Sequence, residues 1–201
     1  LGKEADIWVN LRPGTDGAVA NCWAQVIIEN ELYDDLYVRK WMNAPMLVVQ
    51  EESFKPTPTS SAQQSANIVT RILKESDLKE GGSDGRFMVI NEKNGELSWY
   101  DATAANPGWE GEDWKPATEG REANQPQGFV LDYVPFPDGL WPALHTEEGG
   151  REVTLKDGTK VHVRTVWEHY IDFLADYTPE KASEITGVDP EVLKEAAITY
   201  A

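Results

Sequence analysis

The middle of this 201-residue chain differs in texture from its two ends, and the contrast limits what the chain can fold into. Between about residues 50 and 160, Pro, Gly, Ser, Thr and Glu dominate, and apolar residues come in short bursts. Such a stretch favours turns and short strands over a helical core. We therefore expect 49–164 to be an insertion of β-hairpins and long loops. The ends, 1–48 and 165–201, are expected to be parts of one α/β domain.

The N-terminal part predicts a short strand, a tight turn and two helices. Apolar and polar residues alternate over residues 5–11, and the Arg-Pro-Gly sequence at 12–14 ends this extended segment. Thr15 or Asp16 can then cap a helix with one apolar face, which a second helix follows, ending near residue 43. The residues on that face are Val19, Cys22, Trp23, Val26 and Ile27.

Two turn sequences, Asn94-Gly95 and Asp157-Gly158, predict β-hairpins inside the middle stretch, because both dipeptides favour two-residue hairpin turns. The paired strands are expected at 86–90 with 97–100, and at 152–155 with 160–163. One short helix is expected near 65–75. The C-terminal part predicts three helices, and two of them open with a cap residue, a first-turn proline and an early acid. These openings are Thr178-Pro179-Glu180 and Asp189-Pro190-Glu191.

The charge balance restricts the binding partners. The chain holds 18 Lys and Arg against 35 Asp and Glu, a formal net charge of −17, which repels nucleic acid and anionic membranes. It contains no apolar run of membrane-spanning length and no signal-peptide pattern. Cys22 is the single cysteine, so an internal disulfide or a thiolate cluster cannot form from this chain alone. Among Val19 and Val26, an inert core thiol is expected.

The loop at 12–16 is the strongest candidate for a ligand site. A helix that begins after a glycine turn offers unpaired N–H groups to phosphate or to an electron-rich ring edge. Arg12 adds a cation, Thr15 a hydroxyl, and Asp16 a carboxylate that can accept two hydrogen bonds from a guanine-like edge. The alternative is a capped turn without a ligand. His145, His162 and His169 lack ligand-like spacing, and no metal site is expected.

Two segments resemble the dimethyl sulfoxide reductase family of molybdenum and tungsten oxidoreductases. The first is Ala5-Asp6-Ile7-Trp8-Val9-Asn10-Leu11-Arg12-Pro13-Gly14-Thr15-Asp16-Gly17-Ala18 with 26–34, and the second is 177–191, which begins Tyr177-Thr178-Pro179-Glu180. Together they cover roughly 3–48 and 165–201, in the family's order, and two motifs in order are more specific than one.

The resemblance implies a piece of a doubly wound, Rossmann-like α/β domain that binds molybdopterin guanine dinucleotide, with Gly14, Thr15 and Asp16 at the guanosine end. Arg12 and Pro13 match the family's loop as well, and Arg12 is expected either beside the cofactor or in a purely structural role. The molybdenum or tungsten, an iron–sulfur cluster, the remaining domains and an electron-transfer subunit are then expected elsewhere in a parent enzyme with two-electron redox chemistry. The isolated piece should hold no cofactor or metal and be inactive. We expect an excised piece because the chain opens at Leu1 and ends inside a helical pattern.

The middle departs from compact family members and looks more like longer-loop relatives, among them acetylene hydratase, pyrogallol transhydroxylase and the catechol dehydroxylases of anaerobes. The rival interpretation is a non-catalytic, acidic module that binds carbohydrate or protein. Trp109 and Trp114, which interleave with Glu110, Glu112 and Asp113, would be its anchors. We expect a loop there, held by its tryptophans.

Overall fold

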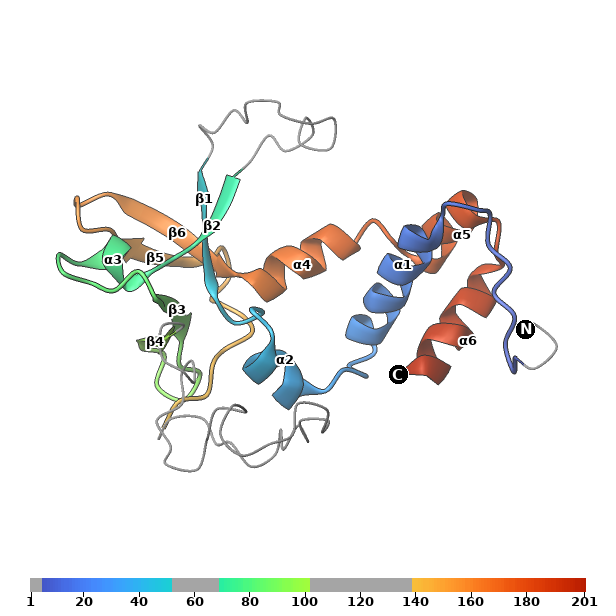
Figure 1. Ribbon diagram of the computed structural model, residues 1–201, viewed down its shortest axis with the longest axis horizontal. Coiled ribbons are helices and arrows are strands. Elements are labelled where there is room, and N and C mark those ends of the chain that lie inside the picture. Colours follow the sequence, from blue (N-terminus) through green and yellow to red (C-terminus); the bar gives the residue numbers. More distant parts are fainter. Residues whose placement is uncertain (1–4, 52–68, 102–138) are drawn as a thin grey trace, which may run out of the picture. The chain divides into compact units, whose positions relative to one another are not determined.

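The computed structural model describes residues 5–51, 69–101 and 139–201, which fall into two compact units (Figure 1). The helical unit comprises Leu1–Asp35 with Glu168–Ala201, and the sheet unit comprises Leu36–Trp167. The observed borders differ from the expected 48/49 and 164/165. That the sheet unit is an insertion into a cofactor-binding domain stays a prediction. None of the described helices is long and apolar enough to cross a membrane.

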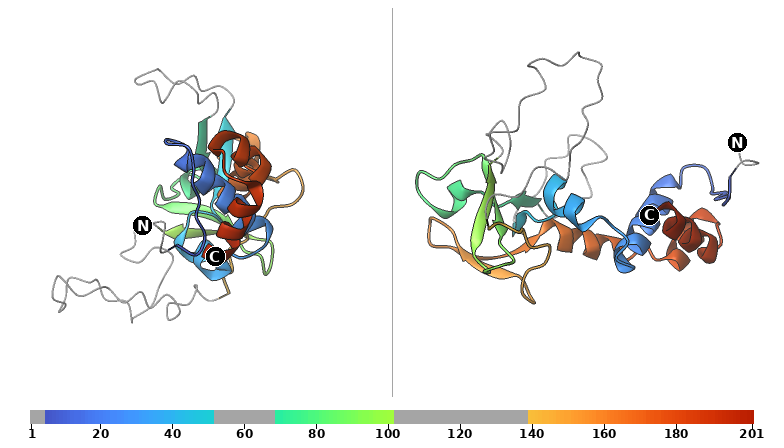
Figure 2. Two further views of the ribbon diagram at one scale, coloured as in Figure 1. Left: turned by 90° about the vertical axis from the view of Figure 1, so that its right-hand side faces the viewer. Right: turned by 90° about the horizontal axis from the view of Figure 1, so that it is seen from below.

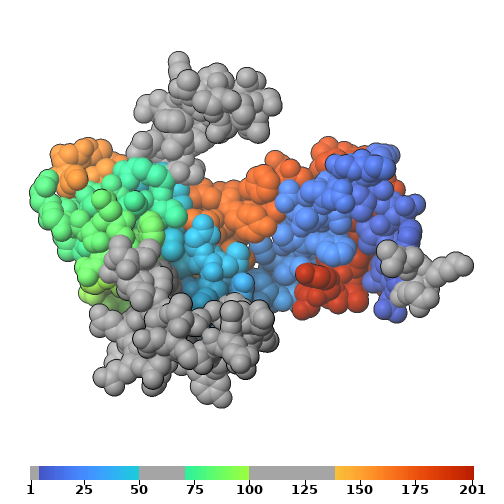
Figure 3. Space-filling model, viewed as in Figure 1, coloured from blue at the N-terminus to red at the C-terminus, as the bar shows by residue number. Residues whose placement is uncertain are grey.

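The helical unit joins both ends of the sequence in one core. Helix α1 (Asp16–Glu29) packs against α5 (Pro179–Thr186) and α6 (Pro190–Tyr200). Figures 2 and 3 show the blue N-terminal helix beside the red C-terminal ones. Small residues at the contact let the helices approach closely. The buried cluster consists of Val19, Cys22, Val26, Ala182, Val188, Leu193 and Ala197.

The predicted helix starts of the C-terminal part are confirmed. The Thr178 Oγ1 accepts a hydrogen bond from the Lys181 N–H at 3.3 Å, and the Asp189 Oδ1 accepts one from the Glu191 N–H at 2.9 Å. Each helix has a proline in its first turn. The third predicted helix, α4 (Val166–Leu174), precedes them.

The predicted strand at 5–11 is wrong, because no described strand pairs with this segment. Its alternation of burial is nevertheless real. Val9 and Leu11 are half-buried and pack against the helical cluster, while Trp8 and Asn10 are exposed. An alternation of apolar and polar residues shows that one side of an extended segment is buried. Here helices, and not a neighbouring strand, bury that side.

The sheet unit contains a four-stranded antiparallel sheet in the order β2-β1-β6-β5. Its strands are β1 (Leu47–Glu51), β2 (Val69–Ile72), β5 (Arg151–Thr154) and β6 (Lys160–Thr165). Strands β3 (Arg86–Ile90) and β4 (Leu97–Asp101) form a separate antiparallel pair. The core between them consists of Leu47, Val49, Leu73, Met88, Ile90, Ala143, Val153 and Val163. Helix α2 (Asp35–Trp41) precedes β1, as the sequence predicts.

The two predicted hairpins are confirmed as β3–β4 and β5–β6, with Gly95 and Gly158 at positive φ in their turns. The short helix predicted near 65–75 is wrong over 69–74, and residues 65–68 lie outside the described residues. Residues 69–72 form β2 because the sequence Val-Thr-Arg-Ile pairs with β1, and only α3 (Glu75–Leu78) follows as a helix. The loop predicted around Trp109 and Trp114 lies outside the described residues.

The mixture of helices and strands agrees with the coarse α/β expectation. Every described strand pair is antiparallel, however, so a parallel, doubly wound sheet is not found in residues 5–51, 69–101 and 139–201. A Rossmann-like arrangement is therefore a proposal about the parent protein, and not a property of these strands.

Glu75 anchors the turn between β2 and β3 with a buried carboxylate. Its oxygens lie 2.6 Å from the Lys79 Nζ and 3.2 Å from the Arg86 Nη1, and one accepts a hydrogen bond from the Ser83 N–H at 3.0 Å. The hydrogen bond from Lys79, followed by the one from Ser83, lowers the pKa of Glu75 to about 2. The ionised form is therefore strongly favoured in the folded state.

We predict that Glu75→Gln lowers the urea midpoint of the sheet unit at pH 7. Because the folded-state pKa is below the unfolded one, the carboxylate's contribution is present above the unfolded pKa of about 4.3 and is lost as the pH falls through about 2. The gap between variant and parent should therefore close over that window. Urea denaturation followed by circular dichroism measures it, with the exposed Glu80→Gln as control. A gap that persists below pH 2 would contradict this account.

Candidate functional site

The loop before α1 brings together the residues predicted to bind a ligand. Gly14 adopts a φ of +84°, which allows the chain to turn sharply. The Thr15 N–H and the Thr15 Oγ1 both donate to the carbonyl oxygen of Arg12, at 3.2 and 2.7 Å. The loop is thus closed by its own hydrogen bonds and has a defined shape.

The start of α1 offers donors beside an exposed carboxylate. Thr15 occupies the N-cap position, as predicted, although its hydroxyl bonds to Arg12 instead of capping the helix. The Ala18 and Val19 N–H groups donate to the Thr15 carbonyl at 3.0 and 3.3 Å. Asp16 and Gly17 precede them, so their N–H groups have no partner within the helix.

Open space adjoins these donors. A Cβ built at Gly14 or Gly17 would meet no atom within 4 Å, and the side chain of Asp16 is exposed. A planar ring could therefore approach the backbone of the loop closely. The arrangement can accept hydrogen bonds at a carboxylate and donate them from two N–H groups, all within one helical turn.

The Arg12 side chain is bound to the end of α5. Its Nη1 donates to the carbonyl oxygens of Glu184 and Ile185, at 2.9 and 3.0 Å. The sequence left open whether Arg12 contacts the ligand or has a purely structural role, and it did not predict these partners, which lie on the last turn of α5. The available signal was the family's pair of motifs, since motifs kept in order often meet in space. The role of Arg12 as a ligand contact stays a prediction.

Cys22 and the histidines do not form a cluster in the described part of the chain. Cys22 is fully buried, and its burial, with a smaller effect of Glu180, raises the pKa of the thiol to about 11. The expected core position of Cys22 is confirmed, and the inertness of its thiol stays a prediction. His145 and His162 are exposed. Over residues 5–51, 69–101 and 139–201, no three His, Cys, Asp or Glu side chains gather as metal ligands.

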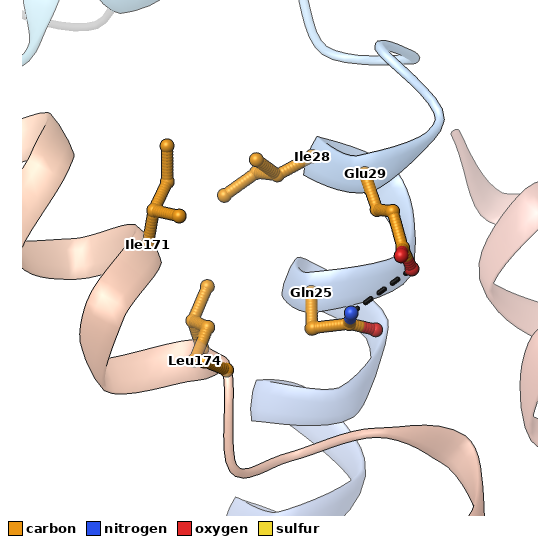
Figure 4. Close-up of a pocket in the computed structure, with 6 residues that line it drawn as sticks. Gln25, Ile28, Glu29, Ile171 and Leu174 are labelled. Atoms are coloured by element: carbon orange, nitrogen blue, oxygen red, sulfur yellow. Dashed lines mark hydrogen bonds between the residues drawn. The ribbon is translucent and has the colours of Figure 1, made fainter. Parts of the chain in front are cut away.

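Apart from this loop, a hollow lies between α1 and the end of α4, within the helical unit. Figure 4 shows Ile28 of α1 facing Ile171 and Leu174 of α4 across it. Its volume is about 220 Å³, and its lining is mainly apolar. The two polar groups at its edge, Gln25 and Glu29, hydrogen-bond to each other at 3.0 Å. The hollow therefore lacks convergent polar groups that would fix a substrate.

Comparison with known proteins identifies the family. The chain is 42% identical to a dopamine dehydroxylase from Eggerthella lenta, in a match that covers 100% of this chain and 22% of that protein. It is 32% identical to the perchlorate reductase subunit alpha from Dechloromonas aromatica, over 98% of this chain and 19% of the relative. It is 27% identical to the dimethylsulfide dehydrogenase subunit alpha from Rhodovulum sulfidophilum, over 98% of this chain and 16% of the relative. No family model matches the chain.

These relatives are molybdopterin enzymes of one group, and the chain belongs to the dimethyl sulfoxide reductase family. It spans about a fifth of the length of the curated relatives it matches. The match extends across the whole chain, so the sheet unit has counterparts in the relatives as well as the two motifs of the helical unit.

We predict that Cys22 resists alkylation in the folded chain. A pKa of about 11 leaves roughly 0.1% thiolate at pH 8, and burial blocks the reagent. Iodoacetamide labelling followed by peptide mass spectrometry should show slow modification in buffer and complete modification in 6 M guanidinium. Rapid labelling of the native chain would show that this part of the core is open.

Proposed function

We propose that the loop formed by Gly14, Thr15 and Asp16 binds the guanosine end of a molybdopterin guanine dinucleotide in the parent enzyme. The observation that supports this most is the exposed Asp16 carboxylate beside unpaired N–H groups and open space. The family membership supplies the identity of the cofactor. The parent enzyme is then an oxidoreductase with two-electron chemistry at molybdenum or tungsten.

The donors and acceptors of the loop fit guanine. The N1–H and the amino group of guanine are two adjacent donors, and one carboxylate can accept both in a bidentate pair. The Asp16 and Gly17 N–H groups, at the positive end of α1, can donate to an oxygen of the nucleotide. The missing side chains at Gly14 and Gly17 leave room for the ring.

The role of this chain is to bind and orient, whereas the metal in the bound cofactor supplies the electron transfer. Ligands for the metal and for an iron–sulfur cluster are proposed to lie in other parts of the parent. The helical unit is proposed to belong to the parent's doubly wound α/β domain. Several relatives are named as alpha subunits, which supports an electron-transfer subunit as a partner.

We predict that Asp16→Asn reduces the cofactor content of the full-length enzyme by about tenfold or more. The substitution replaces an acceptor oxygen by an amide that donates toward guanine donors, and charge-assisted bonds contribute roughly 1.5–3 kcal/mol each. Loss of the helix-dipole interaction alone costs only about 0.3–1 kcal/mol, so the melting temperature should change little. Cofactor content and melting temperature are measured on the same preparations.

The matched control is Glu191→Gln, which removes an exposed first-turn acid from α6, at a distance from the loop in sequence. It should leave the cofactor content at the parental value. If Asp16→Asn keeps its cofactor content but melts at a lower temperature, Asp16 only stabilises the start of α1. The guanosine assignment would then be wrong.

We also predict that the isolated 201-residue chain binds no metal in stoichiometric amount, because its described residues offer no ligand cluster. Elemental analysis of the purified chain is the measurement. One equivalent of molybdenum, tungsten or iron per chain would contradict the proposed division of labour.

A further inference from the structure

The C-terminal end of α5 is closed by a residue from the other end of the sequence. The last four carbonyls of a helix have no partner within it and need one from elsewhere. In α5, the Ser183 carbonyl accepts from the Gly187 N–H at 2.8 Å. The remaining three are all served by Arg12. Its Nη1 donates to residues 184 and 185, and its backbone N–H donates to the Thr186 carbonyl at 2.9 Å.

Gly187 makes this contact possible for two reasons. It ends α5 with a φ of +77°, a left-handed conformation that side chains disfavour. In addition, a Cβ at this position would lie 3.1 Å from the Arg12 Nε and 3.3 Å from its Cζ. The guanidinium therefore lies close to the bare backbone of Gly187, and a Cβ there would require it to shift by a few tenths of an ångström.

The same residue also shapes the candidate site. The Arg12 carbonyl accepts both hydrogen bonds that close the loop, from the N–H and from the Oγ1 of Thr15. Arg12 thus holds α5 through its N–H and guanidinium, and holds the loop through its carbonyl. Its position in space fixes where Asp16 begins α1.

We propose that Arg12 and Gly187 are positioning residues that lock the guanosine loop onto the end of α5. This inference rests on the proposed function of the loop. In this proposal Arg12 acts through the loop, because its Nη1 is engaged by two carbonyls of α5 and its Nε and Cζ lie close to Gly187. The two sequence motifs of the helical unit then act together, because Arg12 lies in the first and Gly187 in the second.

The test uses the full-length enzyme with Arg12→Met, which keeps most of the side-chain volume and removes the charged donors. We expect roughly tenfold lower cofactor content, together with at least tenfold faster hydrogen exchange at residues 184–189, because charge-assisted bonds to orphan carbonyls are lost. The matched control is Lys181→Met, which removes an exposed cation from the same helix and should change neither quantity.

A second pair of variants separates the lock from the general effect of losing a glycine. Asn tolerates the left-handed conformation but carries a Cβ. Gly187→Asn should therefore change both quantities in the same direction as Arg12→Met but less, since its Cβ shifts the guanidinium by a few tenths of an ångström. Gly158→Asn, at a φ of +85° with no atom within 4 Å of a Cβ, should leave the cofactor content unchanged.

The outcomes distinguish the two ideas. Reduced cofactor content with unchanged exchange at 184–189 would make Arg12 a direct ligand contact and overturn the lock. Normal cofactor content in the Arg12 and Gly187 variants, with a reduced content in Asp16→Asn, would overturn the lock and leave the guanosine loop standing. Normal content in all of them would remove the proposed function and the lock together.

Discussion

The helical unit depends on how the end of α5 finds its hydrogen bonds. A helix of eight residues leaves as many carbonyls unpaired at its end as it pairs within, so it needs an outside donor to persist. Arg12 supplies three donors from a residue 172 to 174 positions earlier, and it brings the half-buried Val9 and Leu11 with it onto the core. The same bonds of Arg12 therefore cap the C-terminal end of α5 and attach the N-terminal segment to the core.

The helical unit is built from two segments that are separated in the sequence by the whole sheet unit. The sheet unit brings its own first and last strands together, because β1 pairs with β6 from Leu47 opposite Thr165 to Val49 opposite Val163. A unit whose chain enters and leaves at neighbouring strands can vary in length without separating the segments that it joins. The core of the sheet unit forms among residues of that unit.

Local signals in the sequence predicted local structure well. The Asn94-Gly95 and Asp157-Gly158 turns, and the Pro-containing starts of α5 and α6, are properties of a few adjacent residues, and the structure contains them. The wrong predictions concern segments whose secondary structure depends on partners that are distant in the sequence. Residues 5–11 alternate like a strand but pack on helices, and residues 69–72 form a strand because β1 pairs with them. The partners of Arg12 had no local signal at all.

The charges of the loop support the proposal that its ligand is a base and not a phosphate. Arg12 directs its charge into the carbonyls of α5, and Asp16 places a carboxylate at the mouth of the loop. A phosphate brought there would meet that carboxylate in a chain whose net charge is already −17. A neutral ring edge that donates hydrogen bonds meets an acceptor instead, and gains from its charge. The bonds of Arg12 to the end of α5 thus link the stability of the helical unit to the guanine specificity proposed for its loop.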